Sequence, residues 1–203
     1  MSRCVVQPYG SYAVSQLGGA EMDEARTRLA AMMNVETDEL SFGPSTSQNT
    51  YVLAHAFAET LSPGDVVIVT DQDHEANSGA WRRLEARGME VREWQINDET
   101  GQLETETLAG LLDEKVKLVC FTHCSNIIGQ ENPVPEIVAM AHAVGAVTCV
   151  DGVSMAPHGF ADVGWRSVRA CVRASVRPLT SLKNISSETD RPNLTKLARK
   201  VPW

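Results

Sequence analysis

The sequence predicts an α/β fold with a mainly parallel sheet and helices on both faces, arranged in three layers. Short apolar runs rich in valine and bounded by turn residues recur along the chain, and such runs are typical of strands buried on both faces. Intervals with helical apolar spacing separate them, and strand–helix–strand alternation is the crossover unit of a parallel sheet. The chain has 203 residues, 43% of them hydrophobic, which suits a single domain with a sizeable core.

The first part of the chain contains a loop and two helices. Glycines and a proline predict loop for residues 1–19, and Ala20–Met33 has the composition and the apolar face of a helix. A short strand is expected at Glu39–Phe42, and a helix at Gln48–Leu61. The five residues between them, GPSTS at 43–47, are predicted to form a turn.

Regular alternation of strands and helices begins near residue 65. The expected strands are Asp65–Thr70, Glu90–Ile96, Leu118–Phe121 and Val147–Val150. The expected helices between them are one that ends near Arg87, then Leu103–Asp113 and Pro135–Val144. In parallel sheets ligands bind at the carboxyl ends of the strands, so the polar residues that follow these strands are candidates for a site. These candidates are His123, Ser125, Asn126, Asp151 and Ser154.

The charge of the chain changes sign near residue 163. Residues 164–203 hold nine Lys or Arg and two acids, whereas residues 1–163 hold nine Lys or Arg and twenty-four acids. We therefore divide the chain into a domain at 1–163 and a divergent basic tail at 164–203. A cationic amphipathic helix up to Arg177 fits the tail, and the remainder is expected to be loop or disordered. The tail lacks interleaved aromatic residues, so we expect no nucleic-acid partner.

Several classes of protein are disfavoured by composition. No apolar run approaches the ~20 residues that a membrane span needs, and the N-terminal residues lack the apolar core of a secretory signal. We therefore expect a cytoplasmic protein. No zinc-type Cys/His spacing accompanies Cys120, His123 and Cys124, so no metal site is expected. The cysteines show no disulfide framework; they are Cys4, Cys120, Cys124, Cys149 and Cys171.

Four strand-end or helix-start positions have both a structural and a functional interpretation. Ser45 and Thr46 precede a helix, where they cap it or bind a phosphate. His74 is either solvated or stacked on a planar ring. Asn126 is a turn residue or an amide donor to a phenolate oxygen. Asp151 caps the next turn, or it pairs with a protonated ring nitrogen that offsets the cost of burying its charge.

Four stretches stand in a definite order along the chain: Gly43–Asn49 (GPSTSQN), Ser62–Trp81 (SPGDVVIVTDQDHEANSGAW), Thr122–Gly129 (THCSNIIG) and Asp151–His158 (DGVSMAPH). Together they resemble the class V aminotransferase family of pyridoxal-phosphate enzymes, and more narrowly its cysteine-desulfurase-like members. The resemblance covers roughly residues 12–163 and implies an incomplete large domain of the pyridoxal-phosphate-dependent transferase type. The family uses pyridoxal 5′-phosphate to act on amino acids such as cysteine.

The resemblance implies a role for each matched residue. Ser45 and Thr46 would bind the cofactor phosphate, and His74 would stack on the pyridine ring. Asn126 would contact the phenolic oxygen, and Asp151 would pair with the ring nitrogen. A sixth residue, Ser154, stands where many relatives have Gln or His.

The chain also departs from the family pattern. Where relatives carry the lysine that forms an imine with the cofactor, about 26 residues past Asp151, this chain has Arg177, which cannot deprotonate to form one. The nearest alternative, Lys183 in TSLK, follows no apolar strand. We therefore expect a truncated, catalytically inactive member of the family. A shifted reading frame near codon 164 is our hypothesis for the change in charge.

Two other functions stay open from the sequence. The chain is a non-catalytic module that pairs with a full-length relative or with a second copy of itself, or it is an unrelated α/β nucleotide-binding domain. The second alternative is disfavoured because no glycine-rich phosphate-binding motif of either common type occurs.

Overall fold

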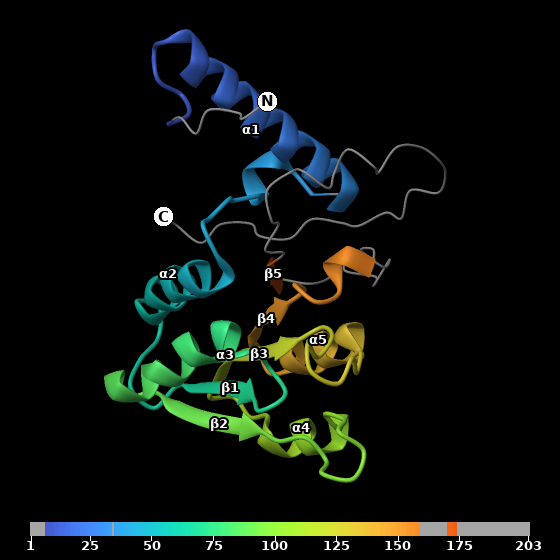
Figure 1. The fold of residues 1–203 in the computed structure, drawn as a ribbon. Helices are drawn as coiled ribbons and strands as arrows, with labels where there is room; N and C mark the ends of the chain where they lie inside the picture. Colours follow the sequence, from blue (N-terminus) through green and yellow to red (C-terminus); the bar gives the residue numbers. More distant parts are fainter. Residues whose placement is uncertain (1–6, 34, 159–169, 174–203) are drawn as a thin grey trace.

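The fold is a five-stranded parallel sheet with helices on both faces, which confirms the predicted α/β class (Figure 1). The computed structural model describes residues 7–33, 35–158 and 170–173. The strand order is β2-β1-β3-β4-β5. The strands are β1 (Val66–Thr70), β2 (Glu90–Trp94), β3 (Val116–Thr122), β4 (Val147–Asp151) and β5 (Ala170–Arg173). The helices are α1 (Ala13–Met33), α2 (Thr46–Ala58), α3 (Glu75–Arg82), α4 (Thr105–Leu111) and α5 (Val134–Ala143).

Successive residues of the central strands point to opposite faces of the sheet, as a period of two requires. In β1, Val66 and Ile68 join one hydrophobic core while Val67 and Val69 join the other. All five residues of β1 are buried, because each face of the strand is covered by helices. The apolar runs seen in the sequence are therefore strands buried on both sides, as predicted.

The two cores differ in the helices that close them. The first core lies between the sheet and helices α4 and α5, and the second lies between the sheet and helices α2 and α3. The first includes Trp94, Leu108, Phe121, Ile137 and Val150. The second includes Ala54, Ala58, Trp81, Cys120 and Cys149.

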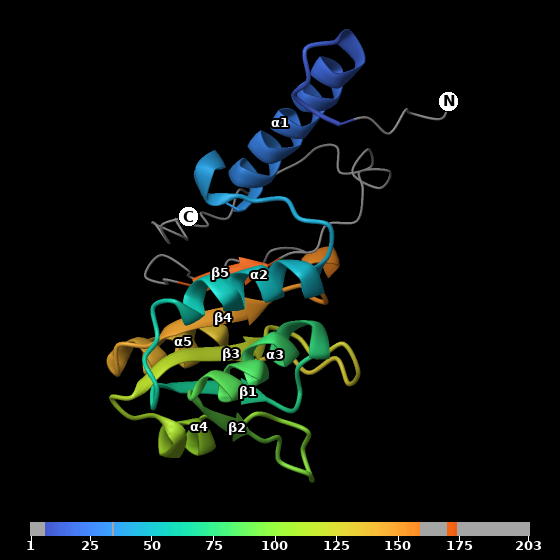
Figure 2. The ribbon, with the colours of Figure 1, turned by 90° about the vertical axis from the view of Figure 1, so that its left-hand side faces the viewer.

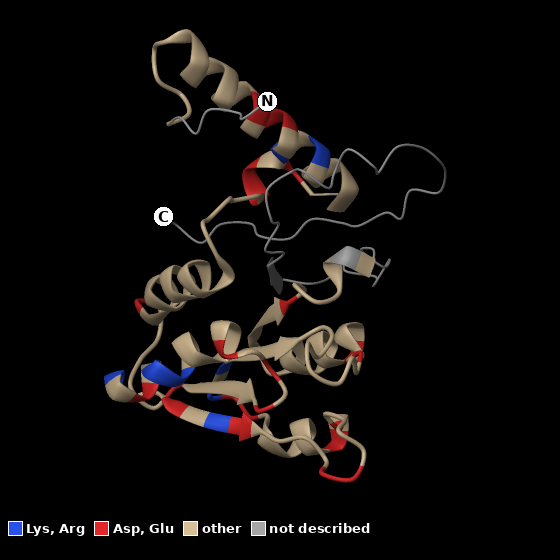
Figure 3. Ribbon diagram, in the orientation of Figure 1, with Lys and Arg blue, Asp and Glu red and all other residues tan. Residues whose placement is uncertain are grey.

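The edge strand β2 differs from the central strands because it carries charge (Figure 3). Arg92 lies 2.7 Å from the carboxylate of Glu90 and 2.8 Å from that of Asp113, which precedes β3. Charged side chains on an edge strand oppose pairing with further strands. The predicted strand at Glu90–Ile96 is thus confirmed, with an end two residues earlier.

Two predictions about the N-terminal region are wrong. Helix α1 begins at Ala13, so it includes seven residues that the glycines had predicted to be loop. Gly19 is buried in this helix, and a Cβ atom there would come within 2.8 Å of the ring of Tyr9. This close approach of the Tyr9 ring explains a glycine inside a helix. The expected strand at Glu39–Phe42 is absent; Thr37–Glu39 forms a 3-10 turn instead.

The basic tail contributes one described element. Ala170–Arg173 forms β5, parallel to β4, with Cys171 opposite Cys149 in the register. The expected amphipathic helix is therefore wrong at these residues, because the open edge of β4 offers backbone partners that the local sequence does not reveal. The other residues of the tail, including Arg177 and Lys183, lie outside the described part of the chain.

Candidate functional site

The loops that follow β1, β3 and β4 meet at one edge of the sheet. All three strands are parallel, so their carboxyl ends point the same way. Thr122 at the end of β3 is opposite Asp151 at the end of β4, and the backbone N–H of His123 donates to the carbonyl oxygen of Asp151 at 2.8 Å. Figure 2 shows that the chain also enters α2 and α3 on the side to which the strand arrows point.

Asp151 is held at this edge as a buried carboxylate, with only 5% of its surface exposed. Its Oδ1 atom accepts a hydrogen bond from the backbone N–H of Val153 at 2.8 Å. This is the capping contact that the sequence left open beside ligand binding. The contact fixes the direction of the carboxylate, and a fixed buried carboxylate is suited to a cationic or N–H donor group.

Asp73, which sequence analysis did not single out, lies in the same region. Its Oδ2 atom accepts a hydrogen bond of 2.5 Å from the side chain of Asn77, and the thiol of Cys120 lies 3.9 Å from the same oxygen. The other oxygen, Oδ1, is buried and has no hydrogen-bond partner among the described residues. Burial, and next the negative charge of Asp151, raise the pKa of Asp73 to about 7. The two acids in the loop that follows the buried strand β1, Asp71 and Asp73, were the signal that could have revealed it.

Two buried cysteines lie next to Asp73 and its hydrogen-bond partner Asn77. Cys120 and Cys149 are opposite each other on β3 and β4, and the thiol of Cys149 lies 3.7 Å from the side-chain oxygen of Asn77. Burial raises the pKa of Cys120 to about 11, so its thiol is protonated near neutral pH and is not a nucleophile. Both cysteines belong to the second hydrophobic core, where a free cysteine packs as a small apolar residue.

His74 is the N-cap residue of helix α3, and its capping hydrogen bond fixes the orientation of its ring. Its Nδ1 atom accepts a hydrogen bond from the backbone N–H of Ala76 at 3.0 Å, which places the proton of the neutral ring on Nε2. The side chain is exposed to solvent at the carboxyl edge. The ring is therefore both oriented by the backbone and accessible to a ligand.

Ser45 and Thr46 stand at the N-terminus of α2, as expected, and the capping interpretation is realised. The hydroxyl of Ser45 accepts from the backbone N–H of Gln48 at 3.2 Å. Ser45 is exposed and Thr46, the first residue of the helix, is half-buried. Capping by Ser45 uses one N–H of the first turn, and a helix N-terminus has four that lack partners within the helix.

Asn126 and Ser154 occupy turns after β3 and β4. Asn126 is exposed, next to the buried Ser125, whose backbone N–H donates to Gln130 at 2.8 Å. Ser154 is half-buried in the turn after Asp151. The structure thus brings Asp151 close to Asp73, orients His74, and leaves Asn126 and Ser154 on loops at the same edge.

A buried hydrogen-bond network, also missed from the sequence, ties the loops together. The amide nitrogen of Asn132 donates to Gln72 at 2.7 Å and to the carbonyl of Thr122 at 2.8 Å. The amide nitrogen of Gln72 donates to the carbonyl of Gly101 at 2.8 Å. Because these residues belong to the loops after β1, β2 and β3, the network holds the three loops in one arrangement. Isolated polar residues in loops gave no signal for it.

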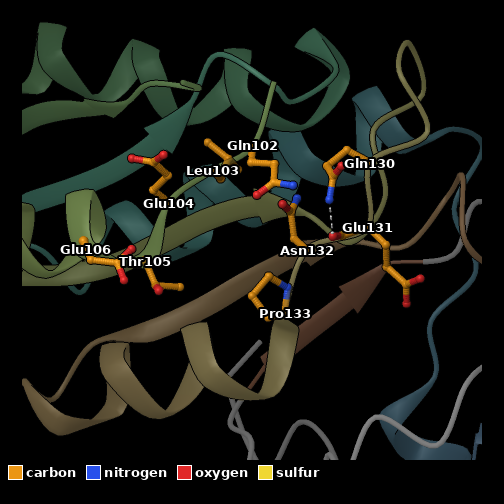
Figure 4. A pocket seen from close by; sticks show the side chains of 9 residues that line it. All are labelled: Gln102, Leu103, Glu104, Thr105, Glu106, Gln130, Glu131, Asn132 and Pro133. Carbon is orange, nitrogen blue, oxygen red and sulfur yellow. Dashed lines mark hydrogen bonds between the residues drawn. The ribbon is translucent and has the colours of Figure 1, made fainter. Parts of the chain in front are cut away.

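A cavity of about 310 Å³ lies beside this network, between the loop after β2 and the start of α5 (Figure 4). Three acids, Glu104, Glu106 and Glu131, are among its lining residues. The imidazole of His123 lies 3.6 Å from Glu131, and burial lowers the pKa of this histidine. None of the six residues predicted to bind a cofactor lines this cavity.

The described residues, 7–33, 35–158 and 170–173, lack two kinds of feature. They contain no cluster of three or more His, Cys, Asp or Glu side chains placed to hold a metal ion. They also contain no helix with the length and apolar character needed to cross a membrane.

The family model and the relatives found by sequence comparison agree with one another. The family model for "Aminotransferase class-V" matches residues 7–170. A cysteine desulfurase of Pectobacterium carotovorum is 38% identical over 157 residues, which are 76% of this chain and 38% of the relative. A cysteine desulfurase of Serratia proteamaculans is 34% identical over the same shares of the two chains.

Comparison with solved structures supports the same fold. The cysteine desulfurase CsdA from Escherichia coli superposes with a TM-score of 0.66 at 24% identity, covering 78% of this chain and 40% of that one. The apo structure of a cysteine desulfurase from Thermococcus onnurineus gives a TM-score of 0.63 at 26% identity, covering 70% and 35%. The chain therefore spans about two fifths of the length of the curated relatives it matches.

Proposed function

Since the chain belongs to the aminotransferase class-V family, we propose that its carboxyl-edge loops bind pyridoxal 5′-phosphate, the cofactor of that family. The observation that carries the proposal is the buried carboxylate of Asp151 at the end of β4, fixed in direction by its hydrogen bond to Val153. Such a carboxylate is stabilised by a ring N–H that donates to it.

The residues present fit the cofactor at three points. The buried Oδ1 atom of Asp73, which has no partner among the described residues, marks a place where a positive or hydrogen-bonding group is favourable. The exposed ring of His74 offers a flat surface held by its contact with Ala76. The first turn of α2, at Thr46, offers backbone N–H groups and the positive end of the helix dipole to a phosphate.

Each of these residues would make a different contact with the bound cofactor. Asp151 would hold the proton on the ring nitrogen, and His74 would stack against the ring and exclude water from one face. Asn126 would donate its amide N–H to the phenolic oxygen, and Thr46 would donate its hydroxyl to the phosphate. When bound, the cofactor supplies an electron sink for bond cleavage at the carbons of an amino acid.

The cofactor proposal is tested by titrating the purified chain with pyridoxal 5′-phosphate and following absorbance and tryptophan fluorescence. We expect saturable binding that Asp151→Asn weakens about 10- to 100-fold, because a charge-assisted hydrogen bond contributes ~1.5–3 kcal/mol. Asp98→Asn, which changes an exposed carboxylate in a turn, is the matched control and should bind as the unchanged chain does. Equal affinity in the unchanged chain and in Asp151→Asn would contradict the proposal.

We further propose that the chain binds the cofactor without turning over cysteine, the substrate named for the relatives. The basis is the sequence: Arg177 stands where the family resemblance expects the imine-forming lysine, and a guanidinium does not form an imine at neutral pH. We expect no sulfide release from cysteine above the rate of free cofactor. Cysteine-dependent sulfide release that Lys183→Ala abolishes would overturn this part.

Pairing with a second chain is a second candidate function, favoured by one observation. Large hydrophobic side chains are exposed on α1, which extends away from the sheet in Figure 1, and on α2. They include Val14 (48% exposed) and Leu17 (62%) on α1, and Val52 (47%) on α2. A helix that exposes several large apolar side chains is typical of a protein interface. Sedimentation of the chain alone and with a full-length relative tests this, and Leu17→Asp should weaken any complex; a monomer in both mixtures would contradict it.

A further inference from the structure

Asp73 lies where the loop after β1 crosses the ends of β3 and β4. Its Oδ2 atom is 3.9 Å from the thiol of Cys120 on β3 and accepts a hydrogen bond from Asn77 at 2.5 Å. The side-chain oxygen of Asn77 in turn lies 3.7 Å from the thiol of Cys149 on β4. Because Cys120 and Cys149 face each other in the register, Asp73 covers this pair from the side of helix α3.

Asp151 shares the same face of the sheet. It follows Cys149 by two residues on β4, and alternate residues of a strand point to the same face, ~6–7 Å apart. Both carboxyl groups are therefore directed toward the α2 and α3 side, at the carboxyl edge. The Oδ1 atom of Asp73 is buried without a hydrogen-bond partner among the described residues. An ionised oxygen in that position is costly, whereas a protonated carboxyl group costs less.

We propose that Asp73 and Asp151 form one coupled carboxyl pair, in which Asp73 carries a proton and releases it to solvent when a protonated ring nitrogen binds at Asp151. The proposal names Asp73 as a positioning residue that acts through Asp151. It rests on the proposed cofactor site for the identity of the ligand, whereas the pair itself is measurable without any ligand.

The surroundings of Asp73 explain why its proton responds to charge at Asp151. Burial raises the pKa of Asp73 most, and the carboxylate of Asp151 is the next cause; together they bring it to about 7. The hydrogen bonds from Asn77 and from the backbone N–H of His74 act in the opposite direction. The Cys120 thiol, with a pKa of about 11, is uncharged near neutral pH. A positive charge beside Asp151 cancels the repulsion, so Asp73 then ionises more easily.

The pair is tested first without ligand, by nuclear magnetic resonance titration of the full chain with ¹³C-labelled aspartate carboxyl groups. We expect one carboxyl signal to titrate near pH 7 and to be absent in Asp73→Asn. Asp151→Asn should lower its midpoint, whereas Asn77→Ala should raise it. Asp98→Asn is the matched control. The proposal is overturned if no carboxyl group titrates above about pH 5.5, or if Asp151→Asn leaves the midpoint unchanged.

The coupling to binding is tested by calorimetry with pyridoxal 5′-phosphate near pH 6.5, in buffers that differ in ionisation enthalpy. The chain should release up to about one proton more per bound cofactor than Asp73→Asn does. The comparison with Asp73→Asn cancels the titration of the cofactor's own phosphate group. Equal proton release in the two proteins overturns the coupling. Absence of binding in every variant overturns the proposed function instead, and the ligand-free titration still decides the pair.

Discussion

The two faces of the sheet are built from the same strands but bury different kinds of side chain. The α4 and α5 face is closed by large apolar residues, among them Trp94, Phe121 and Ile137, which are fully buried. The α2 and α3 face is closed in part by alanines and by the two thiols, and toward the carboxyl edge it buries Asn77 and one side-chain oxygen of Asp73. One face therefore resembles an ordinary hydrophobic core, whereas the other accepts buried polar groups next to the candidate site.

The α4 and α5 face therefore mainly stabilises the fold, whereas the α2 and α3 face carries the candidate site. Burial of apolar area contributes ~25 cal/mol per Å², so the bulky face contributes more to the free energy of unfolding. On the other face, buried polar groups oppose folding unless each is paired, and one oxygen of Asp73 is buried without a partner among the described residues. Buried groups with perturbed pKa values of this kind are concentrated at functional sites.

The largest expected effect is the loss of stability when a large side chain on the α4 and α5 face is truncated. Ile137→Ala should lower the free energy of unfolding by about 2–5 kcal/mol, because Ile137 is fully buried and its loss leaves a cavity. The matched control is Ile127→Ala, at a residue that is 83% exposed, which should change stability by less than about 0.5 kcal/mol. Urea unfolding measures both. The contrast between the faces breaks down if Cys149→Ala costs as much as Ile137→Ala.

The next largest effect is a gain in the free energy of unfolding, and its size depends on pH. The pKa of Asp73 is about 7 in the folded chain against an ordinary value of 3.8, so the folded state binds this proton more tightly and loses stability as pH rises from about 4 to about 7. Above pH 7 the full penalty applies, up to roughly 4 kcal/mol. Asp73→Asn should therefore be more stable than the unchanged chain at pH 8, with the difference vanishing near pH 4. Equal stabilities at pH 8 in urea unfolding would refute this.

A smaller effect is expected in the network that joins the loops. Asn132→Ala should cost about 1–3 kcal/mol, because it leaves the buried side chain of Gln72 and the carbonyl of Thr122 without their donor. Asn126→Ala, at an exposed asparagine six residues earlier, is the control and should leave the unfolding midpoint almost unchanged. If both variants unfold at the same urea concentration, the network does not stabilise the loops.

The smallest effect concerns reactivity rather than stability. Cys124 is half-buried, whereas Cys120 and Cys149 are 0% and 1% exposed, so Cys124 should be alkylated before these two in the native chain at pH 8. Cys120 is further protected because burial raises the pKa of its thiol to about 11. Peptide mass spectrometry after brief treatment with iodoacetamide measures the order. Simultaneous labelling of all three would mean that the thiol-bearing face opens readily.

Local sequence determined the strands of the sheet and its carboxyl edge. Runs such as the one at Val66–Thr70 can only be stable when both faces are covered, so their pattern alone predicts a parallel sheet. The position of Asp151 directly after such a run was likewise enough to make it a candidate. The α/β class, four of the five strands and the location of the candidate site were therefore predictable, because they depend on residues that are close together in the chain.

Tertiary structure alone decided the remaining features, each of which joins residues distant in sequence. The ring of Tyr9 packs so close to Gly19 that only a glycine fits at this helical position, and Ala170–Arg173 is a strand because the edge of β4 was free to pair. The pKa of Asp73 depends on Asp151, 78 positions further along the chain. A sequence pattern reports the periodicity of one segment, whereas packing, strand pairing and charge coupling arise only when the segments meet.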